Sequence, residues 1–306
     1  MNVTALSLRD LEYIVSVADH EHFGKAAQAA HVSQPALSTQ IRKAEDFLGV
    51  RLFERSNRRV TITPTGERII EQARVVLDEA RKIADIVHGD RGPLTGTFKL
   101  AAISTLGPYY LPHVIAPLRR RYPQLVLHLR EGLTEPLLDD LRAGSLDAVL
   151  ASPTEAFDES LNVIPLFTEP FLLAVPKEHA LATKSPLRPS DLRAEDMVLL
   201  EDGHCLKDQS LALCPRNRRG HVRQYQATGL ETLRHLVAAG LGYTLIPQLA
   251  ARDDTKLRRL LCYRAFDGKS VGRPIVLACR KRHARMGDME ALARFLKEHC
   301  PKGMLP

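Results

Sequence analysis

The residues most able to do chemistry lie between positions 201 and 215, in the run EDGHCLKDQSLALCP. This run holds two of the five cysteines, Cys205 and Cys214, and places His204 and Lys207 beside the first of them. A cysteine reacts as its thiolate. An adjacent imidazole, a lysine and a turn such as the one at Gly203 are surroundings that lower the pKa of a cysteine thiol. Cys205 is therefore a candidate reactive thiol. Cys214 lies among apolar residues and has a second interpretation, as an inert buried thiol.

The spacing of these two cysteines is too wide for a simple bridge. If residues 205–214 form one helix, nine steps of about 1.5 Å separate the two cysteines by roughly 13 Å. A disulfide needs a Cα separation of about 4.4 to 6.8 Å. The pair can therefore be bridged only after the segment refolds, which indicates a switch rather than a permanent crosslink.

Two other kinds of site use the same residue types. A zinc site would draw on His204, Cys205, Cys214 and His221, but zinc ligands usually come in closer pairs than the gap found here. A thiol enzyme is the second alternative, and it leaves the N-terminal third of the chain unexplained. Cys262 and Cys279 lie in apolar, strand-like stretches and are expected in the core, whereas Cys300 is expected to be an exposed bystander.

Composition sets broad limits on the class of protein. A chain of 306 residues fits two or three domains. The first thirty residues show no signal-peptide pattern, and no later stretch approaches about 18 uninterrupted apolar residues, so we expect a cytoplasmic protein without a membrane span. The net charge of +7 permits a polyanionic partner. Residues 1–90 contain twelve basic and thirteen acidic residues, so the surplus lies downstream.

The first fifty residues predict three helices. The first follows the N-cap Ser7, the second covers the alanine-rich run GKAAQAAH, and the third runs from Ser33 to a stop at Gly49. A tight connection before a third helix is typical of a helix-turn-helix, whose third helix reads DNA. Its candidate DNA-contacting residues are Ser33, Gln34, Pro35, Ser38, Thr39, Gln40, Arg42 and Lys43.

The next two segments extend this prediction. The run RLFERSNRRVTIT predicts a strand, a basic turn and a second strand, with Arg55, Arg58 and Arg59 placed to contact phosphates. Singly, each of these arginines is equally typical of a solvated surface. A longer helix then carries an apolar stripe from Ile69 to Val87, which needs a covering partner and predicts a dimerisation helix.

Beyond a linker at residues 89–93, strands alternate with helices, which predicts an α/β fold with parallel strands covered on both faces. The pattern changes at the run FTEPFLLAVP and resumes at MVLLE. Two α/β halves joined by crossovers near residues 167 and 271 would leave a cleft between them.

The run HFGKAAQAAHVSQPALSTQIRKAEDFLGVRLFERSNRRVTITPTGE resembles the winged helix-turn-helix of LysR-type transcriptional regulators. The downstream layout is similar to their two-lobed, periplasmic-binding-protein-like effector domain. The resemblance implies a DNA-binding domain at 1–63, a linker and dimerisation helix at 64–92 and an effector domain at 93–306. Lobe I would comprise 93–167 and 272–306, and lobe II 168–271. The runs ISTLGPYYLPH, LEDGHCLKDQSLALC and TGLETLRHLVAAGLGYTLIP are similar to those of peroxide-sensing members.

The resemblance also implies roles for single residues. Cys205 matches a peroxidatic thiol and Cys214 a resolving thiol, which together form a reversible disulfide. Polar residues expected around the reactive sulfur are Thr105, Thr134, His204, Asp208 and Arg280. The basic run PRNRRGHVRQY after Cys214, and Lys207 in place of an arginine, depart from the family pattern.

The same resemblance implies the partners. These are promoter DNA, hydrogen peroxide as signal, RNA polymerase, other copies of the chain in a dimer or tetramer, and glutaredoxin or thioredoxin as reductant. It implies no cofactor, no metal and no enzymatic turnover. One alternative stays open within the family, a regulator that binds a small metabolite in the inter-lobe cleft and whose cysteines are incidental.

Overall fold

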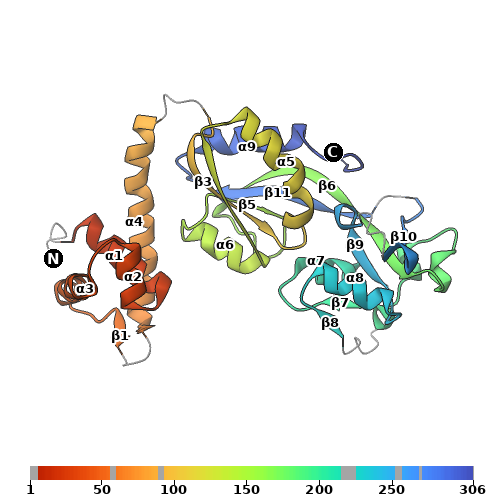
Figure 1. Cartoon of the computed structure of the whole chain (residues 1–306), viewed down its shortest axis with the longest axis horizontal. Coiled ribbons are helices and arrows are strands. Elements are labelled where there is room, and N and C mark those ends of the chain that lie inside the picture. The colour runs from red at the N-terminus through yellow and green to blue at the C-terminus, as the bar shows by residue number, and fades with distance from the viewer. Residues whose placement is uncertain are drawn as a thin grey trace. The chain divides into compact units, whose positions relative to one another are not determined.

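A computed structural model describes residues 6–55, 60–88, 93–214, 225–251, 257–268 and 271–305. The chain divides into two compact units, residues 1–91 and 92–306, each with its own hydrophobic core (Figure 1). No helix among the described residues is both long and apolar enough to cross a membrane.

The first unit begins with three helices, α1 (Leu8–His20), α2 (Phe23–Ala29) and α3 (Gln34–Leu48). Ser7 and Asp10 form a capping box that starts α1, and the Ser33 hydroxyl caps α3 by accepting from the Ala36 N–H. Gly49 ends α3 in the left-handed conformation, as a residue without a side chain does readily. Leu37, Ile41 and Ala44 form the buried face of α3, so its opposite face is left to solvent.

The wing and the long helix complete this unit. Strands β1 (Phe53–Arg55) and β2 (Val60–Ile62) pair antiparallel, and α4 runs from Pro64 to His88. The apolar stripe of α4 divides into two parts. Ile70, Ala73 and Leu77 are buried in the core of their own unit, whereas Val76 and Ile83 are exposed, Ile83 by 69%. Part of the face that the sequence assigned to dimerisation is therefore already covered by α1 and its neighbours.

The second unit is built on a seven-stranded sheet with the order β10-β6-β11-β5-β3-β4, with β9 also paired to β6. Its strands are β3 (Gly96–Ile103), β4 (Leu125–Gly132), β5 (Ala148–Ala151), β6 (Leu161–Pro176), β9 (Thr244–Pro247), β10 (Leu261–Arg264) and β11 (Gly272–Arg280). Parallel pairing of β3 with β4 and β5 follows from the helices that connect them, α5 (Gly107–Arg121) and α6 (Thr134–Arg142). Helix α9 (Met286–Glu298) packs against the β3–β5–β11 part of this sheet, which forms lobe I.

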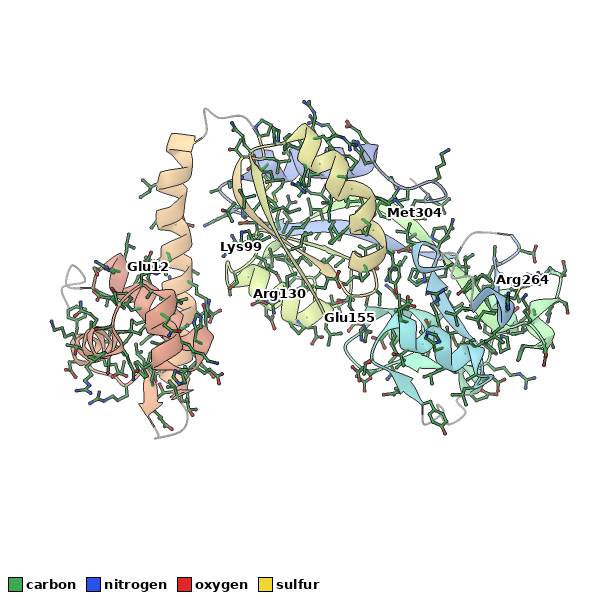
Figure 2. The ribbon with its side chains drawn as sticks, in the orientation of Figure 1. Glu12, Lys99, Arg130, Glu155, Arg264 and Met304 are labelled. Atoms are coloured by element: carbon green, nitrogen blue, oxygen red, sulfur yellow. The ribbon has the colours of Figure 1, made fainter. Side chains whose placement is uncertain are left out.

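The second lobe holds shorter elements. A small parallel pair, β7 (Leu199–Leu200) and β8 (Gln226–Ala227), lies with α7 (Cys205–Ala212) and α8 (Leu230–Ala238). Short 3-10 turns fill the connections, at Ala180–Ala182, Pro189–Asp191, Ala194–Asp196, Gln248–Ala250 and Leu257–Arg259. Figure 2 labels Lys99 on β3 in lobe I and Arg264 on β10 in lobe II.

The two lobes share strands β6 and β11. The first part of β6 pairs with β11 as far as Pro170, and its last residues pair with β9 and β10 of lobe II. The crossing is closed by the Phe171 N–H, which donates to the Val271 carbonyl at 2.8 Å. The predicted architecture, a winged helix-turn-helix with a long helix and then a two-lobed α/β domain, is confirmed.

Candidate redox site around Cys205

Cys205 is the first residue of α7 and only 6% exposed. The chain reaches it from β7 through a turn in which Gly203 has φ +91°, a conformation that a side chain would strain. A Cβ at Gly203 would also lie 3.0 Å from Leu133 Cδ1, at the start of α6. Glycine at this position therefore lets the turn pass close to lobe I and sets Cys205 at the amino end of a helix, where N–H groups face an incoming negative charge.

Lobe I supplies the surroundings of this thiol. Cys205 belongs to the buried cluster of lobe I that also contains Leu106 and Leu249. Thr105 precedes Leu106 in the turn after β3, and Thr134 is the first residue of α6, next to the Leu133 that Gly203 contacts. Both threonines are buried. The fold thus brings the turn before α7, the end of β3 and the start of α6 together at one place.

A buried arginine that sequence analysis missed lies at the same place. Arg273 Nη1 donates to Thr105 Oγ1 at 2.7 Å, and Nη2 donates to the Thr105 carbonyl at 2.8 Å. The same guanidinium is paired with Glu169, whose Oε2 is 3.0 Å from Nε and 2.9 Å from Nη2. Arg273 and Glu169 are opposite each other in the β11–β6 ladder.

The prediction that Arg280 belongs to this group is wrong. Its Nη1 donates to the carbonyls of Leu141 and Leu146, at 2.6 and 2.8 Å, beyond the far end of α6. Arg273 and Arg280 stand at opposite ends of β11, and seven strand steps separate their Cα atoms by roughly 23 Å. The sequence did contain a signal that could have identified Arg273. Each of the two apolar crossover runs holds one charged residue, Glu169 in FTEPFLL and Arg273 in GRPIVL.

His204 is the N-cap of α7 and is buried. Burial lowers the pKa of its imidazole, and a hydrogen bond with the Thr228 backbone and the charge of Glu201 only partly oppose this. A lowered pKa means that the ring is neutral at pH 7. The buried charged groups described in this region are therefore the paired Arg273 and Glu169 rather than an imidazolium.

The two charged residues within α7 differ in exposure, since Asp208 is exposed and Lys207 is half-buried. Asp208 lies one turn beyond Cys205 and is exposed. Lys207 Nζ pairs with the exposed Asp202 at 2.6 Å. Neither residue adds to the buried polar groups around Thr105.

Cys214 lies just beyond the end of α7, in a different buried cluster that belongs to lobe II. Its Sγ is 3.4 Å from Met197 Sδ and 3.7 Å from the Ser210 carbonyl. Burial, together with the negative charge of Glu195, raises the pKa of this thiol. Cys214 is therefore a protonated, apolar-packed thiol in this structure.

Helix α7 holds the two thiols apart. Its eight residues from Cys205 to Ala212 are helical, and the Cys214 N–H donates to the Leu211 carbonyl at 3.1 Å. The helical rise over nine positions gives roughly 13 Å, and both cysteines are free thiols. So short a helix depends on tertiary contacts for its stability. One of these joins Gln209 Nε2 to Ser152 Oγ of lobe I at 2.8 Å, while Gln209 Oε1 is buried without a hydrogen-bond partner among the described residues.

The remaining cysteines have separate surroundings. Cys279 is buried in lobe I, as expected, and Cys262 is half-buried on β10. Cys300 is also half-buried rather than exposed, and burial raises the pKa of its thiol. Among the residues that the structure describes, no three of His, Cys, Asp and Glu form a metal-ligand cluster. His221 lies outside the described residues.

The predicted DNA-contacting residues divide by exposure. Gln34, Pro35, Thr39, Arg42 and Lys43 are exposed on one side of α3, opposite the buried Leu37, Ile41 and Ala44, whereas Ser38 and Gln40 are half-buried. Arg55 is described by its backbone alone, as the last residue of β1, and Arg58 and Arg59 lie outside the described residues.

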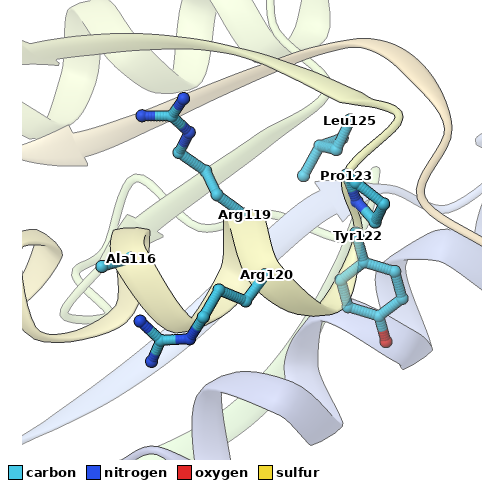
Figure 3. Close-up of a pocket in the computed structure, with 6 residues that line it drawn as sticks. All are labelled: Ala116, Arg119, Arg120, Tyr122, Pro123 and Leu125. Atoms are coloured by element: carbon cyan, nitrogen blue, oxygen red, sulfur yellow. The ribbon is translucent and has the colours of Figure 1, made fainter.

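A surface pocket of about 480 Å³ lies elsewhere, at the carboxyl end of α5. Figure 3 shows its lining, formed by Ala116, Arg119, Arg120, Tyr122, Pro123 and Leu125. None of the residues discussed around Cys205 lines it.

Comparison with known families identifies the class of protein. Residues 8–67 match the bacterial regulatory helix-turn-helix of the lysR family, and residues 91–301 match the LysR substrate binding domain. The chain belongs to the LysR family of bacterial regulators.

Individual relatives are more specific. The chain is 41% identical over 295 residues to the hydrogen peroxide-inducible genes activator of Dickeya chrysanthemi, covering 96% of each chain. A full-length OxyR variant from Pseudomonas aeruginosa superposes with a TM-score of 0.81 at 36% identity and 95% coverage of both chains. A hydrogen peroxide-bound OxyR variant from Corynebacterium glutamicum gives a TM-score of 0.63 at 33% identity, covering 96% of this chain and 92% of the other.

Proposed function

We propose that this protein is a DNA-binding transcription regulator that hydrogen peroxide activates by oxidising Cys205. A reversible disulfide between Cys205 and Cys214 is the stored signal. The observation that carries the proposal is the placement of the two thiols at opposite ends of one short helix, each buried in the core of a different lobe. The likeness to peroxide-inducible activators and to a peroxide-bound structure supports it.

The first step is oxidation of Cys205. The thiolate sulfur attacks one peroxide oxygen, the O–O bond breaks, and the departing hydroxide takes a proton and leaves as water. Sulfur is oxidised to a sulfenic acid and the peroxide is reduced. Thr105 and Thr134 hold and polarise the peroxide with their hydroxyls. The neutral His204 is suited to proton exchange, and the Arg273 guanidinium stabilises negative charge that develops on oxygen.

The second step makes the disulfide. The Cys214 sulfur attacks the sulfenic sulfur, the S–S bond forms, the S–O bond breaks, and water leaves. The two steps together consume two thiols and one peroxide and release two waters. Because α7 holds the cysteines roughly 13 Å apart, this step requires α7 to unwind and Cys214 to leave the contact with Met197.

Refolding of the segment would then change the contacts between lobes and between copies of the chain. Gln209 and Ser152 form one inter-lobe contact that unwinding of α7 would remove. We propose that the chain works as a homodimer or tetramer, joined in part through the exposed Val76 and Ile83 of α4. Re-spacing of the DNA-binding units on a two-fold promoter site would transmit the signal to RNA polymerase.

The remaining parts of the proposal follow from this cycle. Each oxidation consumes the reduced protein, so the chain is a stoichiometric sensor and not an enzyme. A cytoplasmic dithiol system, glutaredoxin or thioredoxin, would restore the two thiols. The cycle needs no cofactor.

Peptide mapping tests the redox proposal. The full-length reduced protein receives one equivalent of hydrogen peroxide, free thiols are alkylated, and the digest is examined by mass spectrometry. We expect one disulfide-linked pair containing Cys205 and Cys214, with Cys262, Cys279 and Cys300 alkylated. An unchanged thiol count, or a different pair, would remove the peroxide proposal and favour a regulator that binds a metabolite between its lobes.

DNA binding has a separate test on the exposed face of α3. Arg42→Ala should weaken binding to all duplexes alike and lower the salt dependence by about one released ion, because a phosphate contact carries no sequence information. Gln34→Ala should also change the preferred sequence, because an amide can read base edges. Fluorescence anisotropy over a salt series measures both. An unchanged salt slope for Arg42→Ala would contradict a phosphate contact there.

A further inference from the structure

Glu169 has a role that neither the sequence pattern nor the resemblance assigns. Its side chain is completely buried in β6, at the point where the chain crosses from lobe I to lobe II. The carboxylate accepts hydrogen bonds from two other elements. Oε2 accepts hydrogen bonds from Nε and Nη2 of Arg273 on β11. Oε1 accepts a hydrogen bond of 3.0 Å from the backbone N–H of Leu249 in lobe II.

These bonds fix the orientation of the arginine. Arg273 is also fully buried, with 1% of its surface exposed, and it has a carboxylate on one side and Thr105 on the other. A guanidinium is a planar group with its donors in fixed directions. Once Glu169 holds Nε and Nη2, Nη1 is directed at Thr105 Oγ1 and Nη2 at the Thr105 carbonyl.

The hydrogen bond from Arg273 fixes the direction in which the Thr105 hydroxyl proton points. A threonine hydroxyl has one proton to donate and two lone pairs to accept with. Because Oγ1 accepts from Arg273, the proton is turned away from the guanidinium and remains available to another acceptor. A charged donor also polarises the hydroxyl and strengthens its own donation.

The direction matters because of what surrounds this pair. Leu106, which follows Thr105, and Leu249, whose N–H Glu169 accepts, belong to the same buried cluster as Cys205. The network and the proposed reactive thiol are therefore attached to one buried cluster, to which both lobes contribute residues.

We propose that Glu169 is a positioning residue for peroxide reduction: through Arg273 it orients the Thr105 hydroxyl as a donor to the peroxide, and through Leu249 it makes that orientation depend on the lobes staying together. This inference rests on the proposed function. Glu169 does not touch the peroxide, so it acts only through the arginine and the threonine.

The test measures two reactions of Cys205 in the full-length protein. One is the second-order rate constant for oxidation by hydrogen peroxide, and the other is the rate of alkylation by iodoacetamide, which needs no hydrogen-bond donor from Thr105. For Glu169→Gln we expect the peroxide rate constant to fall about 100-fold, as when one preorganised donor is lost. The iodoacetamide rate should change less than about threefold, whereas general loosening of the fold would change both rates together.

A double-mutant cycle shows whether the effect passes through Thr105. Thr105→Val should slow the peroxide reaction to a similar extent, and Glu169→Gln combined with Thr105→Val should be no slower than Thr105→Val alone. Effects that multiply in the double variant would overturn the inference. A peroxide rate constant for Glu169→Gln within about threefold of the wild type would overturn it as well.

Loss of Glu169 alone leaves a buried arginine unpaired, which can prevent folding. If Glu169→Gln does not fold, the paired variant Glu169→Met with Arg273→Met takes its place, because apolar residues of similar size often replace a buried ion pair without loss of stability. It should show the same slow peroxide reaction, and a wild-type rate would overturn the inference. If wild-type Cys205 reacts with peroxide no faster than Cys262 does, the proposed function itself fails.

Discussion

Cys205 and Cys214 share one short segment but have opposite surroundings. Cys205 is at the amino end of α7 and packs in the core of lobe I, the same lobe that holds Thr105 and the Arg273 hydrogen-bonded to it. Cys214 follows the carboxyl end of α7 in the core of lobe II, where burial and Glu195 raise the pKa of its thiol and its sulfur lies 3.4 Å from the thioether of Met197. We therefore expect the reactivity of each thiol to depend on the core that it enters rather than on its neighbours along the chain.

The comparison also explains why the two thiols are kept apart. A thiol near polar hydrogen-bond donors is suited to attack on peroxide, whereas a protonated thiol in an apolar site is protected from it. If both were equally reactive, either one could be oxidised first and the order of the two steps would be lost. In the proposed cycle, helix α7 keeps that order by holding each cysteine in a different buried core.

The largest expected effect comes from removing Cys205, the thiol proposed to react with peroxide. Cys205→Ser should abolish disulfide formation and slow peroxide consumption by more than about 100-fold, because the remaining thiols lack the polar network. Alkylation followed by mass spectrometry measures both effects. Cys262→Ala is the matched control and should respond like the wild type; a full peroxide response from Cys205→Ser would contradict the assignment.

Removing the other member should stop the cycle halfway. Cys214→Ser should leave the rate of the first step within about twofold of the wild type, because Cys214 lies in a different core. The sulfenic acid at Cys205 should then persist and react with a dimedone probe. A slow first step in this variant would mean that Cys214 takes part in peroxide reduction itself.

The packing around Cys214 allows a sharper test. Met197 is fully buried against Cys214, so Met197→Ala should lower the free energy of unfolding of the reduced protein by about 2 to 5 kcal/mol. The disulfide form should lose less, because Cys214 no longer occupies that site. Thermal and urea unfolding of both forms measure the difference. Met289→Ala in the core of lobe I is the control, and its cost should be equal in both forms.

The smallest expected effect concerns the helix between the thiols. Ala212→Gly on the exposed end of α7 should destabilise the helical, reduced form by up to about 1 kcal/mol. The disulfide then becomes harder to reduce, and its potential should fall by up to about 20 mV. Equilibration with glutathione measures this shift. Ala291→Gly in α9 should leave the potential unchanged, and an equal shift there would show that general stability, not α7, sets the potential.

Much of this architecture was predictable from the sequence, because local signals agreed with one another. Ser7, Ser33 and Gly49 mark helix ends through hydrogen bonds and backbone freedom that depend on a few neighbouring residues. The separation of the cysteines was calculated on the condition that a helix joins them, and α7 covers Cys205–Ala212. The resemblance then indicated Thr105, Thr134 and His204, and all three side chains are buried.

The failures concern partners that are distant in the sequence. Arg273 and Arg280 both end the same apolar strand, and only the pairing of Arg273 with Glu169 across the crossover decides which one meets Thr105. The exposure of Asp208 depends on how α7 turns against lobe I. On α4, the stripe from Ile69 to Val87 was a single surface in the sequence, but α1 covers part of it. Each of these three features is determined by tertiary contacts, which the local sequence pattern does not reveal.

The crossing between lobes is a two-stranded antiparallel ribbon, in which Pro170 is paired with Gly272 and Glu169 with Arg273. Pulling the lobes apart along this ribbon would break ladder hydrogen bonds and expose a buried ion pair. Twisting it would cost far less, because two-stranded ribbons accept a wide range of twist. From this pairing we expect the lobes to rotate about the ribbon more easily than they separate, so that a change at one helix would turn one lobe relative to the other.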